Sequence, residues 1–478
     1  MAKAFIDILK AVEVEQQQRQ AIVLALRGDQ GLLEPVGTSP MPGSKADFGP
    51  LAVPAVRATM SAVHRNQRYR YRAMDYDPYR PEIIADPYPA YRQLRAEDPV
   101  HWSDKLGGWV LTRYDDVKEA LHGQRFSADR ATPFADHMAA KDEPEIARVG
   151  RMLGRWVVFN DPPRHTVLRR LLFEAFSPKM IDGLRGQIAE TVDALLDDLT
   201  GRDRIDLVGD FAFPLPAIVI AHVLGVPERD LDQFRAWSSD LATLVGNARA
   251  TPDRYRRGGR ALLALTEYFE GVVAERRRQG SEAALVDRLI AARDTDDALN
   301  EDELVANCIL ILFAGHETTT NLIANGMALL LQRPGQMAAL RAEPALTAKA
   351  IEEMLRFETP AHSVVRIAAE DQTLHGKDIR RGDRVFVMIG AANHDPAMFE
   401  QPEHFDIMRK PGRHIAFGYG PHFCIGAHLA RVEGRVAFEA LLRRLPEMSF
   451  AEETLDWIDT LVLRGLRSLP LVRTPLAA

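Results

Sequence analysis

The chain of 478 residues carries 60 Lys and Arg against 67 Asp and Glu, and this net charge of −7 argues against general nucleic-acid binding. Hydrophobic residues make up 46% and charged residues 27% of the chain, which is the balance of a soluble globular protein. The two cysteines, Cys308 and Cys424, are too few for a disulfide framework and fit a reducing cytoplasm. No run of about 18 apolar residues occurs, so we expect no stable membrane span and no secretion signal.

Residues 1–73 differ in composition from the rest. The stretch 34–54 is rich in Pro and Gly without periodicity, and HRNQRYRYR at 64–72 is a basic run. We predict that 1–73 form a flexible or linker-like N-terminal extension and that the domain covers 74–478. A docking arm for an acidic partner or a membrane surface, and a start of translation at Met74, are the alternatives.

The order of patterns after residue 74 predicts an α-rich α+β domain. Short strands at 100–103 and 108–112 flank a glycine turn, and helical patterns then follow from about 114 to 358. Strands return at 373–390, where glycines mark turns. A glycine-rich loop at 417–426 precedes a last long helix.

The loop FGYGPHFCIG at 417–426 contains a cysteine just before this helix. Its glycines allow left-handed backbone or a close approach to a flat group. At a helix N-terminus, free N–H groups and the positive end of the dipole favour a thiolate at Cys424. A thiolate held in this way is a good axial ligand for haem iron, whereas a buried structural cysteine is the ordinary alternative.

The loop matches the pattern F-x-x-G-x-x-x-C-x-G and resembles the haem-binding loop of the cytochrome P-450 monooxygenases in their bacterial form. His414 supplies the leading histidine of that form and His422 the one before the cysteine. The resemblance covers about residues 74–478. It implies a large helical domain with a smaller β-sheet region, and haem b (iron protoporphyrin IX) between a distal and a proximal long helix. It implies that Cys424 is the iron ligand and that these loop residues contact the haem: Phe417, Gly418 and Gly426.

The segment EMLR at 353–356 resembles the E-x-x-R motif of the same family. Glu353 and Arg356 are three apart and therefore share a helix face on which they can pair. An exposed pair of this kind contributes little, but the resemblance implies a buried pair that braces the thiolate loop. Either His404 or Arg409 supplies its third member.

The segment DPPRHTVLRRLL at 161–172 resembles the one whose His and Arg face the haem propionates. His165 and Arg169 are four apart on a helix that two prolines open. Two carboxylates in a dry cleft require cations and hydrogen-bond donors. Arg366 and His414 match further propionate positions. His394 stands where the family frequently has Arg.

The segment AGHETT at 314–319 lies within a long apolar helix, where glycine and unpaired polar groups are costly. It resembles A-G-x-[DE]-T-[TS] in the helix that crosses the distal haem face. Ala314 and Gly315 are small, so dioxygen and substrate can lie against them and the haem. We expect the glycine and hydroxyls to open the helical hydrogen bonds locally and admit water. Glu317 and Thr318 then form the catalytic pair that delivers protons.

The resemblance implies a haem-thiolate monooxygenase that inserts one oxygen atom of O2 into a lipophilic small molecule by hydroxylation or epoxidation. The chain carries no flavin, nicotinamide or iron–sulfur pattern, so electrons come from an external ferredoxin and ferredoxin reductase. A peroxide-driven hydroxylase is one alternative, against which the intact acid–alcohol pair counts, and a haem-binding sensor or carrier is another. We expect a cytoplasmic monomer. The expected ferredoxin-docking residues are Arg155, Arg164, Arg170 and Arg413.

The substrate pocket is expected to be apolar. Its walls come from 126–158, 215–250, 362–365, 460–463 and the long helix, and a terpenoid, steroid, macrolide or fatty acyl chain would fit. The expected lining residues are Leu310, Val364, Val365 and Leu463.

Overall fold

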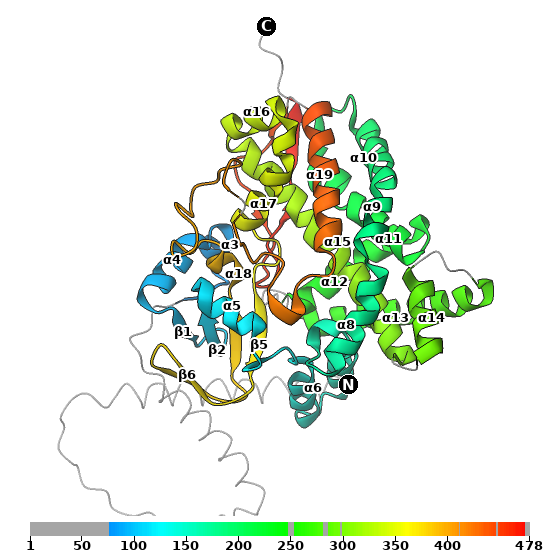
Figure 1. Ribbon diagram of the computed structural model, residues 1–478, viewed down its shortest axis with the longest axis vertical. Coiled ribbons are helices and arrows are strands. Elements are labelled where there is room, and N and C mark those ends of the chain that lie inside the picture. Colours follow the sequence, from blue (N-terminus) through cyan, green and yellow to red (C-terminus); the bar gives the residue numbers. More distant parts are fainter. Residues whose placement is uncertain are drawn as a thin grey trace, which may run out of the picture. The chain divides into compact units, whose positions relative to one another are not determined.

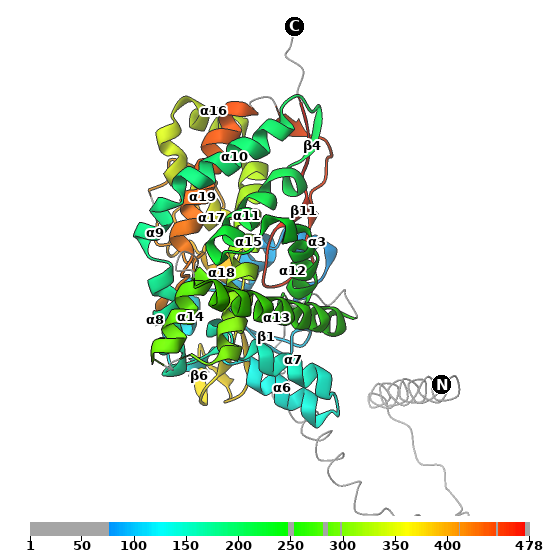
Figure 2. The same cartoon turned by 90° about the vertical axis from the view of Figure 1, so that its right-hand side faces the viewer.

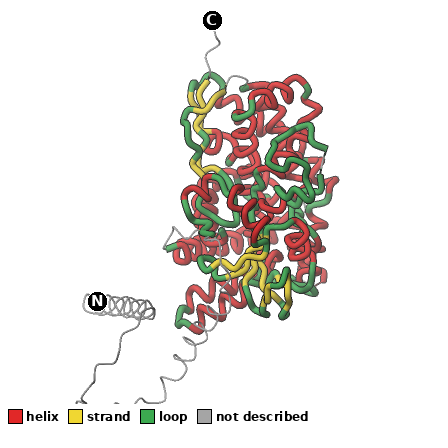
Figure 3. The backbone as a smooth tube through the Cα atoms, turned by 90° about the vertical axis from the view of Figure 1, so that its left-hand side faces the viewer, coloured by secondary structure: helices red, strands yellow, loops and turns green. Residues whose placement is uncertain are grey.

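The computed structural model describes residues 76–246, 253–280, 285–296, 299–410, 412–445 and 448–473. The predicted extension at 1–73, and Met74, lie outside these residues. Helices make up most of the described chain, and the strands gather in two separate places (Figures 1 and 3). Among the described residues, none of the helices combines the length and apolar character that a bilayer crossing requires. The predicted α-rich α+β class is confirmed.

Most of the helices follow one another between the two strand-rich regions of the sequence. Helices α12 and α13 pack along each other, and α13 also contacts α14 and α15 (Figure 2). The helices are α3 (Pro81–Ala85), α4 (Tyr88–Glu97), α5 (Tyr114–His122), α6 (Ala131–Ala140), α7 (Pro144–Leu153), α8 (Arg164–Ala175), α9 (Pro178–Gly183), α10 (Arg185–Leu199), α11 (Pro214–Leu224), α12 (Leu231–Val245), α13 (Arg254–Gln279), α14 (Leu285–Asp296), α15 (Glu301–Leu331), α16 (Pro334–Ala342), α17 (Thr347–Phe357), α18 (Ile389–Ala392) and α19 (Ala427–Arg444).

The largest sheet has five strands in the order β1-β2-β8-β5-β3, in which β2 and β8 are parallel and the other neighbours antiparallel. A three-stranded sheet, β4-β12-β9, joins the C-terminal strands to the middle of the chain, and β6-β7 and β10-β11 form hairpin-like pairs. The strands are β1 (Val100–Ser103), β2 (Gly108–Leu111), β3 (Phe126–Ser127), β4 (Arg204–Asp206), β5 (Val364–Ala368), β6 (Gln372–Leu374), β7 (Lys377–Ile379), β8 (Arg384–Val387), β9 (Met448–Phe450), β10 (Asp456–Trp457), β11 (Leu466–Ser468) and β12 (Pro470–Arg473).

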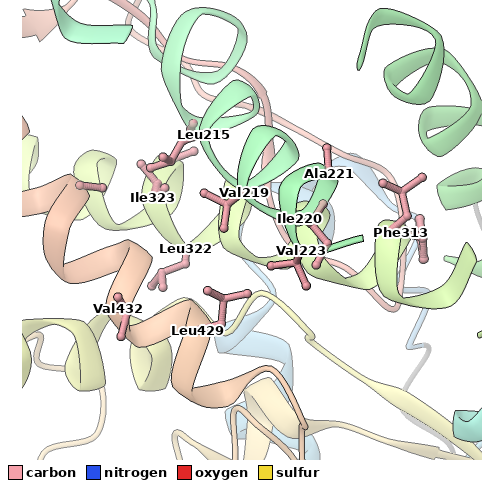
Figure 4. Packing of buried hydrophobic residues seen from close by; sticks show 14 of the residues in the cluster. Leu215, Val219, Ile220, Ala221, Val223, Phe313, Leu322, Ile323, Leu429 and Val432 are labelled. Atoms are coloured by element: carbon pink, nitrogen blue, oxygen red, sulfur yellow. The ribbon is translucent and has the colours of Figure 1, made fainter. Parts of the chain in front are cut away.

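Helix α15 runs through the main hydrophobic core. It begins with a capping box, in which the Asn300 side chain accepts from the Glu303 N–H and the Glu303 carboxylate accepts from the Asn300 N–H. Along its length it packs between α11 and α19 (Figure 4), so that Leu322 points toward Val432 of α19. The 31 residues of α15 therefore connect the element that follows the cysteine loop with the opposite wall of the core.

The predicted strand at 100–103 matches β1, and the predicted strand at 108–112 matches β2 to within one residue. The prediction at 373–390 was wrong at its end, because Ile389 and Gly390 begin the short helix α18. The strands after α19 were not predicted, since each is only two to four residues long.

Candidate functional site

The cysteine loop is shaped by glycines in left-handed conformations. Gly418 and Gly420 have φ values of 75° and 74°, which side chains with a Cβ rarely adopt. The chain folds back on itself so that the Cys424 N–H donates to the Phe417 carbonyl over 2.9 Å. Helix α19 then begins at Ala427, and the Gly426 N–H points at the Cys424 sulfur. The loop therefore presents one sulfur at the start of a long helix.

The thiol of Cys424 borders open space although protein atoms enclose its other sides, whereas Cys308 is buried within α15. This enclosure raises the pKa of Cys424, and the Gly426 N–H, Arg169 and Arg431 oppose the rise without cancelling it. The stabilisation of the thiolate by backbone N–H groups that the sequence predicted is present, since the Gly426 N–H lowers the pKa of Cys424, but desolvation is the larger effect. A metal cation bound to the sulfur would supply the missing stabilisation.

A cluster of basic side chains lies beside the cysteine loop. The His165 ring on α8 packs on the His422 ring of the loop, with centroids 4.0 Å apart. Arg169, one turn further along α8, donates to the Phe423 carbonyl over 2.5 Å. Burial lowers the pKa of both histidines, and the charges of Arg169 and of the buried Arg366 on β5 lower it further.

The cluster also contains Arg130, which the sequence reasoning missed. Burial lowers the pKa of Arg130 and of Arg366 to about 10, and the two guanidinium groups repel each other. Burial, followed by the charge of Arg366, lowers the pKa of His422 to about 3, so this ring is neutral at pH 7. Asp161 is the carboxylate that faces Arg366, and it also accepts a hydrogen bond from the Ala128 N–H at 2.8 Å.

Three guanidinium groups and one carboxylate leave two positive charges in excess within this cluster. They belong to Arg130, Arg169 and Arg366, with Asp161 as the carboxylate. Buried charges are ordinarily paired. The cluster is therefore suited to a ligand that brings two carboxylates to the same side of the cysteine loop.

The Glu353–Arg356 pair on α17 is buried, and both guanidinium–carboxylate hydrogen bonds measure 2.7 Å. Arg409 is the third side chain of the network, donating to Glu353 over 3.1 Å. His404 contributes only its backbone carbonyl, to which Arg356 and Arg409 both donate. Arg356 also donates to the carbonyls of Asn393 and Pro402, so one side chain ties α17 to the segment before the cysteine loop.

The centre of α15 is an uninterrupted helix. The Thr318 hydroxyl donates back to the Ala314 carbonyl over 3.0 Å, and the predicted opening of the helix is absent from this described segment. Ala314 is exposed on a helix that is otherwise largely buried, so it borders an open space. Glu317 is partly exposed, and its carboxylate lies 3.4 Å from Nε2 of His316.

The sequence predicted that Gly315 also faces this open space, but Gly315 faces helix α11 instead. A Cβ on Gly315 would lie 2.7 Å from the Ile220 side chain of α11. The glycine is therefore required for the close packing of α11 on α15.

A cytochrome P-450 family model matches residues 107–454. The chain belongs to the cytochrome P-450 family. It is 39% identical over 402 residues to the monooxygenase PikC of Streptomyces venezuelae, covering 82% of this chain and 92% of the relative. It is 38% identical over 399 residues to the vitamin D(3) 25-hydroxylase of Pseudonocardia autotrophica, covering 82% and 95%. The crystal structure of a Bacillus megaterium cytochrome P-450 in complex with testosterone superposes with a TM-score of 0.75 at 34% identity, covering 82% of this chain and 99% of that one.

The family establishes the reaction class and the cofactor. Cytochromes P-450 bind haem b through a cysteine thiolate, and this cytochrome P-450 is a monooxygenase that acts on small lipophilic molecules. The described residues fit the haem: an accessible cysteine sulfur suits the iron cation, and two surplus positive charges suit the two propionates.

His414 is not brought to the basic cluster. Its Nε2 lies 3.0 Å from the Glu352 carboxylate, and its Nδ1 accepts from the Ala416 N–H. Arg431 shares the same carboxylate and also lies over the Phe417 ring at 4.4 Å. His414 thus joins a brace between α17 and α19. His422, two residues before the cysteine, occupies the place in the cluster that His414 was expected to fill.

The predicted pocket residues divide between two cores. Leu310 and Leu463 belong to the main core, whereas Val365 packs in a second core with side chains of α4 and β8. Side chains of a strand alternate between faces, so Val364 and Arg366 share the face that Val365 does not. The assignment of Val365 to the pocket was wrong, and the strand pattern could have revealed it.

Arg155 and Arg164, which were expected to dock a ferredoxin, are engaged with acidic side chains. Arg155 pairs with Asp302 at 2.7 Å, and Arg164 pairs with Glu303. Arg413 is exposed just before the cysteine loop, and Arg170 is exposed on α8. His394 stacks on Tyr88 and bonds to the Phe357 carbonyl, so it braces this part of the chain.

Proposed function

We propose that Cys424 supplies the thiolate of this cytochrome P-450 and that the basic cluster holds the haem propionates. The observation that carries this assignment is an accessible cysteine on a glycine-shaped loop beside two uncompensated positive charges. The second cysteine, Cys308, is enclosed in α15, where burial raises its pKa to about 12. The proposed propionate contacts are Arg130, His165, Arg169, Arg366 and His422.

We propose that Glu317 and Thr318 handle the protons of the reaction, with Ala314 facing the haem and substrate. Haem bound through a thiolate supplies the activation of dioxygen. While the Thr318 hydroxyl donates to the Ala314 carbonyl, its oxygen lone pairs remain available to accept from a water molecule. Thr318 thereby orients a proton-donating water, and the Glu317 carboxylate exchanges protons with solvent.

An external ferredoxin and its reductase are the proposed electron donors. The side chains exposed near the cysteine loop support this choice, because Phe423 and Tyr419 are exposed and Lys118 lies 4.8 Å above the Tyr419 ring. An acidic ferredoxin would be attracted to Lys118 and Arg413. Lys118→Glu combined with Arg413→Glu should slow ferredoxin-supported turnover, more so at low salt, and leave the spectrum of the haem unchanged. Unchanged turnover would show that the ferredoxin does not dock at Lys118 and Arg413.

We further propose a sterol-sized, mostly apolar substrate and a cytoplasmic monomer. The vitamin D(3) 25-hydroxylase relative and the testosterone complex of a neighbour support the substrate class, and the two free cysteines are consistent with the location. A ligand screen that reads the spin state of the haem would identify molecules that enter the pocket.

The experiment that tests the proton role is Thr318→Ala. The variant should bind haem and substrate as the wild type does, but it should divert reducing equivalents from product to free hydrogen peroxide. Product formation should be measured with NADPH and both partners, with hydrogen peroxide alone, and with neither. Fully coupled turnover by the variant with NADPH would refute the role of Thr318, and equal wild-type turnover with peroxide alone would point to a peroxide-driven enzyme.

A further inference from the structure

Two buried asparagines on α15 have amide atoms without a hydrogen-bond partner among the described residues. Asn321 lacks a partner for Nδ2, and Asn325 lacks one for Oδ1, although both residues are no more than 3% exposed. Asn307, on the same helix, is equally buried but fully bonded, accepting from the Val157 N–H and donating to two carbonyls. A buried amide atom left without a partner costs about 1–3 kcal/mol, and ordered water is the usual remedy.

These asparagines lie on the side of α15 that continues from Glu317. Residues 317, 321 and 325 are spaced by four, so they follow one another along one side of the helix at steps of about 6 Å. Two hydrogen bonds of about 3 Å cover one such step through a single water molecule. A chain of a few water molecules therefore matches the distance from Asn325 to the Glu317 carboxylate.

The backbone opposite the asparagines leaves room for them. A Cβ on Gly465 would lie 1.9 Å from Oδ1 of Asn321, so only glycine is compatible with this side chain. The preceding residue, Arg464, accepts from Nδ2 of Asn325 through its carbonyl at 3.0 Å. The segment before β11 thus forms a polar wall along this side of α15.

The row of asparagines ends at a cavity of about 560 Å³ that Asn325 and Arg464 both line. The Arg464 guanidinium pairs with Glu358 at 2.6 Å, also in the cavity wall, so the charge at this point is balanced. Tyr88 donates to Glu358 over 3.0 Å and adds a further polar group. A hydrated cavity of this size holds many water molecules next to the buried Asn325 amide.

We propose that ordered water bound by Asn321 and Asn325 connects this cavity to Glu317 and forms a proton-supply route to the active site. Each water molecule accepts one proton on the cavity side and passes one on. The Glu317 carboxylate likewise gains one proton and releases one, so the route moves protons without oxidation or reduction. Asn321 and Asn325 are positioning residues, since their amides hold the water and do not titrate. The inference rests on the proposed role of Glu317.

The direct test is a high-resolution crystal structure of the haem-loaded protein. It should contain ordered water within hydrogen-bond distance of Nδ2 of Asn321 and of Oδ1 of Asn325, continuous with water in the cavity. In Asn325→Leu this water should be lost while α15 keeps its position. A dry Asn321–Asn325 segment in the wild type would overturn the proposal whatever the activity.

The kinetic test compares Asn325→Leu with Asn325→Ser, which retains a small polar group and room for water. Asn325→Leu should lower the kcat of NADPH-driven turnover about tenfold and change the solvent deuterium isotope effect. Its substrate affinity, read from the haem spin state, should stay the same, and Asn325→Ser should recover most of the rate. Tyr76→Phe removes another buried hydroxyl, outside α15 and the expected pocket walls, and serves as the control with unchanged kinetics.

Glu317→Gln, measured in parallel, distinguishes a failure of the proposed Glu317 role from a failure of the proposed water route. Full turnover by Glu317→Gln would refute the proposed role of this carboxylate. A slow Glu317→Gln together with wild-type kinetics in Asn325→Leu would leave that role intact and reject the route along Asn321 and Asn325.

Discussion

Glu433 offers a test of how tightly α19 packs on α15, because it is an acid placed where a charge is costly. Its side chain is 1% exposed, and neither carboxyl oxygen has a hydrogen-bond partner among the described residues. Burial raises its pKa from 4.5 to about 8, and the nearby Thr319 hydroxyl only partly opposes this. The folded protein therefore holds Glu433 neutral at pH 7.

The sign of the stability effect follows from proton release. As pH rises above 4.5, the unfolded chain loses this proton while the folded chain keeps it until about pH 8, so unfolding becomes more favourable across this interval. The separation of the two pKa values sets an upper limit of about 5 kcal/mol on the stability lost by pH 8. The side chain in Glu433→Gln is neutral at every pH, so this variant does not lose stability in this way as pH rises.

The assay is equilibrium unfolding of the haem-loaded protein at pH 5, 6.5 and 8, followed by haem absorbance and circular dichroism. The free energy of unfolding of Glu433→Gln, relative to that of the wild type, should rise steadily with pH. At pH 8 the variant should be more stable by about 1–3 kcal/mol, after relaxation of the site is allowed for. Glu439→Gln, at an outer position of α19 where Glu439 pairs with Arg435, is the control and should show no such trend. A difference between Glu433→Gln and wild type that does not change with pH would refute the reasoning.

Four further substitutions test packing and haem retention. Gly315→Ala forces a Cβ against Ile220 and should lower the free energy of unfolding by about 1–3 kcal/mol. The control is Gly271→Ala on α13, where an added Cβ would meet no atom within 4 Å and the free energy of unfolding should rise by up to about 1 kcal/mol. Equal effects of the two substitutions in thermal unfolding would show that Ile220 does not require a glycine at 315. Arg356→Lys loses the bidentate bonds to a buried carboxylate and should destabilise the protein by about 3–5 kcal/mol with loss of haem, measured by haem content after purification. Arg366→Leu removes one of the two surplus positive charges and should speed haem transfer to an acceptor protein, and an unchanged transfer rate would show that Arg366 does not hold a propionate.

The parts of the site that the sequence predicted are those set by local spacing. The cysteine loop before α19 and the three-residue step from Glu353 to Arg356 depend on neighbouring residues, so they can be read along the chain. The choice between Arg409 and His404 could not be made, because it depends on how a loop folds back on α17.

Other features depend on contacts between distant segments. The reason for Gly315 is the Ile220 side chain almost a hundred residues earlier, and no local pattern reports such a neighbour. The role of His414 was misjudged because Glu352, its partner, lies on another helix. Arg130 carries no motif of its own and is recognised only through its proximity to Arg366. For Val365 the signal was present, since alternation along β5 separates it from Arg366.

The central claim is that the sulfur of Cys424 binds haem iron as an anion, although the protein alone holds it as a thiol. The most direct measurement is the absorption spectrum of the reduced haem-loaded protein under carbon monoxide. We predict the strongly red-shifted Soret band that thiolate ligation produces, and its loss in Cys424→Ser. A correctly folded wild-type protein without that shift, or a Cys424→Ser protein that retains it, would contradict the account.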